Sequence, residues 1–313
     1  MVKEIVRHTP KVTTLADGTD AVLHMTDLVG EEAGPLVGIS ASVHGNENCG
    51  SQAILDLFRI LQTMKIKGRI RLLPVVNARA MTVNARFNPI DHLDLNRQFP
   101  GDPNGTFSQQ LAAALTREFL GKIDMHIDLH SGTDRPTVDY VYLLNDEGLS
   151  RAFGSKLLYR PDDGKQGTTF SGTTKEVTMP RGIPATVIEL GGGIVDQGPY
   201  IERIVAGVLN MLRHAGVIEG EEAAPGEQIV VNEIAGIRPT TGGWIEPLSP
   251  PLGEPVNGGA PLFRVVSPYT FEVLEEVSAP FENGIMIMGH LTRNLVEAGD
   301  YGWMVGNLEG STL

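Results

Sequence analysis

The feature that most constrains this chain is an alternation of short apolar runs with amphipathic, helix-like segments over its first two-thirds. The run PLVGISASV, from residue 35, is rich in Val and Ile and ends at the polar turn HGNENCG. The next segment, SQAILDLFRILQTM, has apolar residues at helical spacing. Together these pieces predict a strand, a loop and a helix.

The same alternation continues along the chain. The runs RIRLLPVV, MHIDLHSG, VDYVYLLN and PATVIELGGG predict further buried strands. FSQQLAAALTREFL, with Thr106 or Ser108 as its N-cap, and a segment from about Tyr200 to Ala215 are expected to be helices. Strands that alternate with helices indicate an α/β sheet covered on both faces.

A long polar loop and a change of composition interrupt this pattern. The loop runs from about residue 77 to 104, and a loop of that length is uncommon unless it is functional. Near Gly220 the segment GEEAAPGEQ is small, polar and acidic, as expected of a domain boundary. We therefore predict a larger domain over residues 1–222 and a smaller one over residues 223–313.

The segment after this boundary predicts a small all-β domain. Its short apolar pieces are separated by turns rich in Gly and Pro. GGWIEPLSPPLGEPVNGGAPLFRVV and NGIMIMGHLTRNLVEAGDYGWMV both run from a Gly turn through a strand to a second Gly turn and strand. This weak internal repeat predicts a two-fold sandwich of hairpins.

Composition excludes several classes of partner. The formal net charge is −13, and no cluster of Lys and Arg reverses it locally, so we expect no binding to nucleic acid. No window approaches the ~18 apolar residues that cross a bilayer, and the start lacks a secretory signal. The single cysteine, Cys49, fits a reducing compartment. A cytoplasmic protein that binds a small molecule is expected, with a homo-oligomer left open.

Three side chains are candidate metal ligands. His44 and Glu47 stand three apart in the turn after a predicted strand, and His130 ends another predicted strand. The carboxyl ends of the strands are where sites form in an open α/β sheet. Two imidazoles and one carboxylate leave a fourth position for water, which is the arrangement of catalytic zinc. Co, Ni or Mn remain alternatives at such a site.

The choice of His130 depends on its place at the strand end. Strand alternation puts His126, Asp128 and His130 on one face, so His126 is an alternative ligand. A supporting or purely structural role for His126 and Asp128 is equally open.

Other candidates supply acid–base and anion-binding groups. Glu189 ends the apolar run PATVIEL, where a carboxylate is costly to bury, and is the candidate to move the proton during amide hydrolysis. Arg86, Asn96 and Arg97, in ARFNPIDHLDLNRQFPG, can stabilise an oxyanion and bind an anionic substrate group. The alternative is a solvated loop with ordinary salt bridges.

In this order, HGNE, NARA, ARFNPIDHLDLNRQFPG, DLHSG and VIELGGG resemble the succinylglutamate desuccinylase and aspartoacylase family, relatives of the zinc carboxypeptidases. The resemblance covers roughly residues 35 to 215. It implies a mixed central sheet flanked by helices, one Zn²⁺ on His44, Glu47 and His130, and Glu189 as general base and acid. It also implies that Arg86 polarises the scissile carbonyl. Asn96 and Arg97 would then bind the α-carboxylate of the substrate.

The sequence departs from the family pattern in ways that bear on the substrate. The stretch TTKEVTMPRGIP has no Tyr, and Arg181 does not match the arginine with which aspartoacylases recognise an acidic side chain, so N-acetylaspartate is not expected. The region after residue 220 is similar to the β domain of bacterial members, some of which deacetylate N-acetyl-diaminobutyrate. It looks like a barrel-sandwich or lipoyl-type module, but no lysine follows Lys175 that could carry a lipoyl group.

Three functions follow as alternatives. The first is a zinc amidohydrolase of a small N-acyl amino acid, in which the β domain narrows the entrance to the site and loops near residues 145–180 shape the acyl pocket. The second is a zinc carboxypeptidase that trims short peptides. The third is a non-catalytic binding protein on the same fold, against which the full set of catalytic side chains argues.

Overall fold

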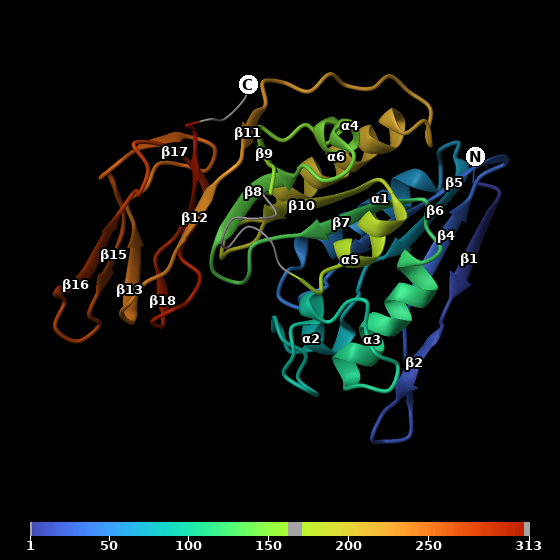
Figure 1. Cartoon of the computed structure of the whole chain (residues 1–313), viewed down its shortest axis with the longest axis horizontal. Helices are drawn as coiled ribbons and strands as arrows, with labels where there is room; N and C mark the ends of the chain where they lie inside the picture. The colour runs from blue at the N-terminus through green and yellow to red at the C-terminus, as the bar shows by residue number, and fades with distance from the viewer. Residues whose placement is uncertain (1, 162–170, 310–313) are drawn as a thin grey trace.

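The computed structural model describes residues 2–161 and 171–309 and has a large mixed sheet at its centre (Figure 1). The strand order is β1-β4-β6-β5-β7-β10-β8-β17-β19-β12, with β9, β11 and β14 attached beside this path. The strands of this sheet are β1 (Glu4–His8), β4 (Met25–Val29), β5 (Glu32–Ala41), β6 (Lys67–Leu73), β7 (Met125–His130), β8 (Thr137–Tyr142), β9 (Leu157–Tyr159), β10 (Ala185–Gly191), β11 (Ile229–Val231), β12 (Ile234–Ile237), β14 (Pro255–Asn257), β17 (Asn283–Gly289) and β19 (Trp303–Asn307).

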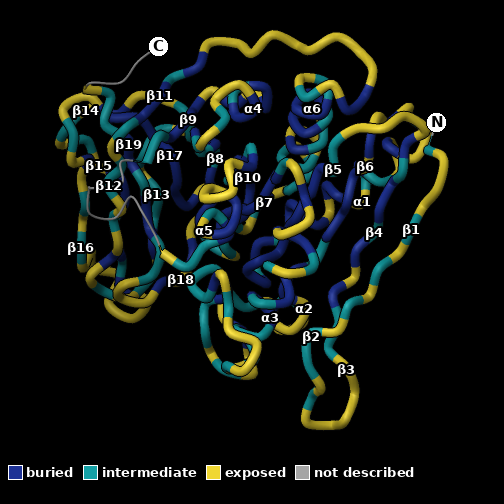
Figure 2. The backbone as a smooth tube through the Cα atoms, turned by 45° about the vertical axis from the view of Figure 1, so that its right-hand side comes forward, coloured by how far each residue is buried: buried dark blue, intermediate teal, exposed yellow. Residues whose placement is uncertain are grey.

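The middle of the sheet is parallel and its flanks are antiparallel. Strands β6, β5, β7 and β10 run parallel, whereas β4 and β8 pair antiparallel at either side. The predicted α/β fold with a mixed sheet is therefore confirmed. Figure 2 shows that the parallel strands are the most deeply buried part of the chain.

Helices cover both faces of the sheet. The helices α1 (Cys49–Leu61), α4 (Glu147–Ala152) and α6 (Gly198–His214) pack on one face, and α3 (Phe107–Leu115) packs on the other. Both faces of strand β5 are covered. Val37 and Ile39 pack in the core beneath α1 and α6, whereas a Cβ at Gly38 would meet Phe119 on the opposite face. This explains why its sequence is continuously apolar.

The cap of α3 lies at one of the two expected positions. Thr106 is the N-cap, and its backbone N–H donates to Gln109 Oε1 at 3.0 Å. This contact belongs to a capping box, in which the third helical residue satisfies the cap residue's amide. The helix continues as a π-helical turn over Thr116–Leu120.

The remaining elements are short and border the sheet or the long loop. They are β2 (Lys11–Thr14) and β3 (Asp20–Val22), which form a hairpin, then α2 (Ala78–Thr82), α5 (Lys175–Thr178) and the 3₁₀ turns at Leu95–Arg97 and Met179–Arg181. Of the residues described, no helix is both long and apolar enough to cross a bilayer.

The C-terminal region adds a second sheet, in the order β16-β15-β13-β18. Its pairing bears out the internal repeat. Strand β13 of the first half pairs with β15 and with β18, the middle strand of the second half. Strand β17 of the second half pairs with β19 and with β14, the middle strand of the first half. Phe263 and Trp303 stack between the two sheets with ring centroids 4.5 Å apart. The four strands are β13 (Gly243–Pro247), β15 (Pro261–Val266), β16 (Val273–Ser278) and β18 (Asn294–Val296).

The C-terminal region is also joined to the rest of the molecule through the large sheet. Strand β17 pairs with β8 at Met288 and Val138, and β11 pairs in parallel with β9. Residues on both sides of position 222 therefore share one sheet. The division into two domains at 222/223 stays a prediction.

Candidate metal centre and active site

The predicted ligands lie at the carboxyl ends of two neighbouring parallel strands. His44 and Glu47 belong to the turn between β5 and α1, and His130 is the last residue of β7. Strands β5 and β7 are in register, with Ala41 opposite Leu129. Since parallel strands end at the same edge of a sheet, the turn and the strand end meet there.

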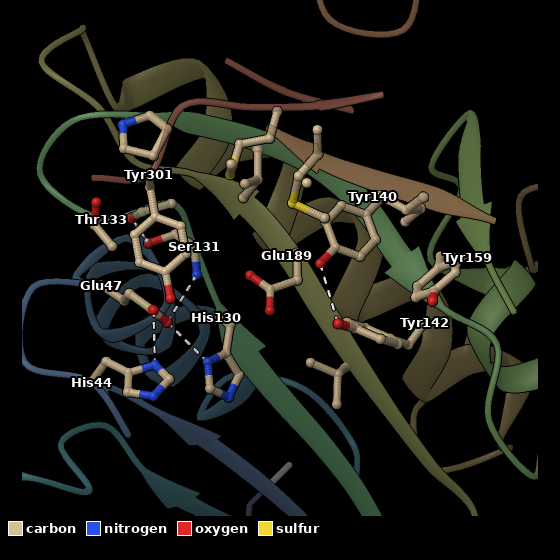
Figure 3. A pocket seen from close by; sticks show the side chains of 18 of the residues that line it. His44, Glu47, His130, Ser131, Thr133, Tyr140, Tyr142, Tyr159, Glu189 and Tyr301 are labelled. Atoms are coloured by element: carbon tan, nitrogen blue, oxygen red, sulfur yellow. Dashed lines mark hydrogen bonds and ion pairs between the residues drawn. The ribbon is translucent and has the colours of Figure 1, made fainter. Parts of the chain in front are cut away.

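The three side chains converge in the way that a metal site requires. His44 Nδ1 lies 2.8 Å from Glu47 Oε1, and His130 Nδ1 lies 2.8 Å from Glu47 Oε2. All three are buried, and one potential ligand atom from each lies within 4.8 Å of the others. Figure 3 shows both imidazoles directed at the glutamate.

The far side of each imidazole faces a carboxylate. His44 Nε2 lies 3.1 Å from Asp94 Oδ1, and His130 Nε2 lies 3.5 Å from Asp128 Oδ2. Burial alone raises the pKa of Asp94, but the hydrogen bond from His44 holds it well below its usual value. Such carboxylates fix the tautomer of metal-binding histidines, leaving Nδ1 free to coordinate. The donor set therefore fits a zinc ion, with both Nδ1 atoms and Glu47 as ligands.

Asp128 and His126 support this arrangement from behind. Ser40 Oγ donates to Asp128 Oδ1 at 2.7 Å, and Thr174 Oγ1 donates to Asp128 Oδ2 at 2.9 Å. His126 Nε2 lies 2.8 Å from Ser40 Oγ, and its ring contacts Phe119. The structure thus places His130 beside His44 and Glu47. His126 lies earlier in β7, against Ser40 and Phe119.

Arg86 lies against the same cluster. Its Nη1 is 3.3 Å from Glu47 Oε1, and its Nη2 is 3.0 Å from Asp94 Oδ2. The guanidinium carbon lies 5.8 Å from the ring centroid of Tyr301. Asp94 thus contacts both His44 and Arg86, which fixes the arginine beside the candidate metal ligands.

Glu189 comes from the neighbouring strand. It lies in β10 opposite His130 of β7, so both side chains project from the same edge of the sheet. Burial raises the pKa of Glu189, the charge of His130 opposes this and the charge of Glu47 adds to it, and the net result is a pKa of about 8. A buried carboxyl with a raised pKa is suited to accept and return a proton near neutral pH.

Asn96 and Arg97 form part of a tight turn beside the cluster. Asp94 Oδ1 accepts the backbone N–H of Asn96 at 2.9 Å, and both residues border the same cavity as Glu189. Asn96 Oδ1 is buried, with no hydrogen-bond partner within residues 2–161 and 171–309. A buried polar atom of this kind is expected to be satisfied by a bound molecule.

The C-terminal region closes one side of the cavity, whose volume is about 280 Å³. Ile237, Arg238, Met288, Tyr301 and Trp303 all line it. The Arg238 guanidinium carbon lies 4.3 Å from the centroid of the Tyr301 ring. The site is therefore a pocket bordered by both parts of the chain.

Sequence reasoning missed several residues of the site. Asp94 lies within the quoted loop motif but had no signal beyond its charge. Tyr301 lies far from the motifs in sequence and comes near Arg86 through the pairing of the C-terminal strands with the large sheet. Tyr140 and Tyr142 lie in a strand whose pattern is that of a core strand. Of the loops near 145–180 that were expected to shape the acyl pocket, residues 162–170 lie outside the described residues.

Comparison with known proteins agrees with this geometry. The model of the succinylglutamate desuccinylase/aspartoacylase catalytic domain matches residues 33–215. The chain is 29% identical over 261 residues to N-alpha-acetyl-L-2,4-diaminobutyric acid deacetylase of Halomonas elongata. This alignment covers 78% of the chain and 74% of the relative.

Solved structures share the fold over nearly the whole chain. A succinylglutamate desuccinylase/aspartoacylase from Rhodobacter sphaeroides is 27% identical, with a TM-score of 0.79, and the match covers 96% of this chain and 95% of that one. The product-bound ectoine utilization protein EutE (DoeB) from Ruegeria pomeroyi superposes with a TM-score of 0.81 at 23% identity, over 98% and 97% of the two chains. Both matches include the C-terminal region.

Proposed function

This chain belongs to the succinylglutamate desuccinylase/aspartoacylase family, and from that premise we propose that it is a zinc-dependent deacylase of a small N-acyl amino acid. The observation that carries the proposal is the convergence of His44, Glu47 and His130 in one pocket with the buried Glu189. A proton-transfer group beside a metal site is what amide hydrolysis requires.

The metal would be held by Nδ1 of His44, a carboxylate oxygen of Glu47 and Nδ1 of His130. A bound zinc ion supplies a coordinated water of lowered pKa and polarises the acyl carbonyl. Asp94 and Asp128 orient the two imidazoles for this role.

Glu189 is proposed to handle the proton. Its carboxylate accepts a proton from the attacking water and then donates it to the leaving amine, so the group ends in its starting state. Burial supports this, because a raised pKa lets the carboxyl hold the proton between the two steps.

The cationic side chains are proposed to bind the substrate's oxygens. Arg86 lies beside Glu47, where its guanidinium can donate to the oxygen that becomes negative at the acyl carbon. Asn96 and Arg97 border the same cavity and are proposed to bind the α-carboxylate. Both groups would then fix the amide between the metal ligands and Glu189.

The small volume of the cavity favours a small substrate over a peptide. Side chains of the C-terminal region, including Tyr301 and Arg238, border the site. A carboxypeptidase would use the same Asn96 and Arg97 but needs room for the rest of the peptide. A cytoplasmic location and a homo-oligomeric state remain predictions.

The experiment is amine release from N-acetyl amino acids and from short peptides, with zinc-loaded and chelator-treated protein compared. The relative from Halomonas elongata makes N-acetyl-2,4-diaminobutyrate one of the compounds to include. We expect chelator-sensitive release from N-acetyl amino acids. Release from peptides alone would favour the carboxypeptidase, and no release from any compound would favour a binding protein. Parallel loading with Co, Ni and Mn tests the choice of metal.

A further inference from the structure

The cavity has a second end, built by the sheet, that none of the proposed catalytic groups occupies. Side chains alternate along a strand, so Val138, Tyr140 and Tyr142 of β8 point to one face, and all three line the cavity. Tyr159 of β9 stands beside Tyr142 in the parallel pair of these strands. Glu189 of β10 is the direct neighbour of Tyr140 on the other side.

The three tyrosines form a continuous aromatic wall. The ring centroids of Tyr140 and Tyr142 lie 5.3 Å apart, those of Tyr142 and Tyr159 lie 5.4 Å apart, and those of Tyr140 and Tyr159 lie 6.2 Å apart. These are contact distances for aromatic pairs. Figure 3 shows the wall on the opposite side of Glu189 from the metal ligands.

The wall is uncharged. Burial raises the pKa of both Tyr140 and Tyr142, so their hydroxyls stay protonated, and Tyr140 donates to Tyr142 at 3.3 Å. Apolar side chains also line the cavity. They include Leu144, Pro161, Val187, Ile234, Met288 and Met304.

Such a wall suits an apolar group better than a cation. A cage for an ammonium ion needs aromatic faces on several sides, each within about 6 Å of the cation. Here the rings contact one another instead, which leaves no room for an ion between them. An apolar or aromatic group packed on the wall would be removed from water over its whole contact area.

The place of Arg97 indicates which part of the substrate reaches the wall. Arg97 and Tyr142 both line the cavity. A carboxylate bound by Arg97 is attached to the α-carbon, and so is the amino acid side chain. A side chain on that α-carbon can therefore extend along the same cavity toward the tyrosines.

We propose that the wall of Tyr140, Tyr142 and Tyr159 receives the amino acid side chain and selects N-acyl amino acids whose side chain is aromatic or large and aliphatic. This inference rests on the proposed deacylase function and specifies its substrate class. Lys175 lines the same cavity and would favour an acidic side chain instead, so acidic substrates are the informative comparison.

The test compares kcat/KM of zinc-loaded enzyme for N-acetyl derivatives of L-phenylalanine, L-leucine, L-alanine, L-aspartate and L-2,4-diaminobutyrate. Only the side chain varies in this series. We expect the phenylalanine and leucine derivatives to exceed the other three by about tenfold or more, since a buried apolar group contributes at least that factor. Preference for the aspartate or diaminobutyrate derivative would overturn the inference while leaving the deacylase function intact.

A binding measurement separates this inference from the proposed function. Calorimetry with the free amino acids L-phenylalanine, L-alanine and L-aspartate does not depend on turnover. Tighter binding of L-phenylalanine than of the other two amino acids would support the wall, even if the protein hydrolyses none of the compounds. Absence of hydrolysis would by itself refute the deacylase function. If L-phenylalanine bound no more tightly than L-aspartate, the proposed role of the wall would be contradicted.

A variant tests whether the aromatic wall causes the preference for the phenylalanine derivative. Tyr159→Ala should reduce the ratio of kcat/KM for the phenylalanine derivative to kcat/KM for the alanine derivative by about tenfold. Tyr269→Ala is the matched control, because Tyr269 is 88% exposed and lies outside the cavity. An unchanged phenylalanine-to-alanine ratio in folded Tyr159→Ala would refute the assignment, and Tyr159→Leu provides a second variant of milder volume change.

Discussion

In the proposed mechanism a single buried carboxyl, that of Glu189, transfers the proton. Glu189→Gln keeps the shape of the side chain and removes its ability to accept a proton. We expect turnover to fall by about a hundredfold or more while zinc content stays at the wild-type level. Metal analysis beside steady-state rates checks this. Near wild-type turnover in the glutamine variant would remove Glu189 from the proton-transfer role.

The same residue predicts a direction of pH dependence. Burial raises the pKa of Glu189 to about 8 in the protein alone, and a nearby zinc cation favours the charged form and lowers that pKa. The base must be deprotonated to act, so kcat/KM should fall as the pH is lowered, with the midpoint below 8. A pH–rate profile measures this limb. A wild-type rate that increases toward low pH would contradict the assignment of Glu189 as the base.

The sequence contained most of the metal site but little of its support. His44, Glu47 and His130 follow strand ends, and parallel strand ends meet at one edge, so their convergence was predictable. Asp94 was not, because its contact with His44 depends on the path of a long irregular loop. The tyrosines were not distinguished because a strand that lines a pocket has the same pattern as one that lines a core.

Among the elements, the antiparallel pair β4 and β6 contains a buried ion pair. Asp27 of β4 accepts from Arg71 of β6 at 2.7 and 2.8 Å, and both side chains are buried. Burial raises the pKa of Asp27, but the Arg71 hydrogen bonds outweigh it and hold the pKa below its usual value. The pair thus fixes one edge of the sheet that carries the site.

Asp27→Asn should lower the free energy of unfolding by about 3 kcal/mol, because it leaves the Arg71 charge buried without its partner. The wild-type contribution is fully present above the ordinary carboxylate pKa and is lost as the pH falls through the lower pKa of the folded state. Urea unfolding at several pH values measures both effects. Asp56→Asn, which breaks an exposed pair with Arg59, is the control and should cost less than about 1 kcal/mol. Equal losses in the two variants would contradict this account.

The elements of the parallel sheet were predictable where their pattern was strong. Continuous apolar runs and helical spacing identified β5, β7, β10, α1 and α6. The edge strand β1 and its neighbour β4 carry mixed polar and apolar residues, and no element was predicted there. The repeat in the C-terminal region was visible because its Gly turns recur, but the exchange of strands between its halves depends on long-range pairing.

At the scale of the whole molecule, the C-terminal region borders the cavity and limits its size. Arg135, in the loop after β7, forms an ion pair with Asp300, in the turn before β19. This contact joins the two parts of the chain next to the site. We infer that it helps to keep the C-terminal region against the cavity.

Arg135→Ala should therefore increase hydrolysis of N-acetyl dipeptides relative to N-acetyl amino acids, because the entrance is less firmly closed. The expected change in the ratio of kcat/KM values is about twofold to fivefold, since a partly exposed pair contributes up to about 1 kcal/mol. Arg59→Ala is the control, because its exposed pair with Asp56 lies in α1. A ratio equal to that of the control would argue against this contact as a restraint on substrate size.

The account as a whole depends on one zinc ion at His44, Glu47 and His130 that supports amide hydrolysis. The most direct measurement is amine release from an N-acetyl amino acid during stepwise return of zinc to chelated protein, with His44→Ala titrated in parallel. We predict that activity is absent without metal, rises in proportion to added zinc and levels off at one zinc per chain, while the variant neither binds zinc tightly nor regains activity. Full activity in metal-free protein, or one tightly bound zinc in His44→Ala, would contradict the central claim.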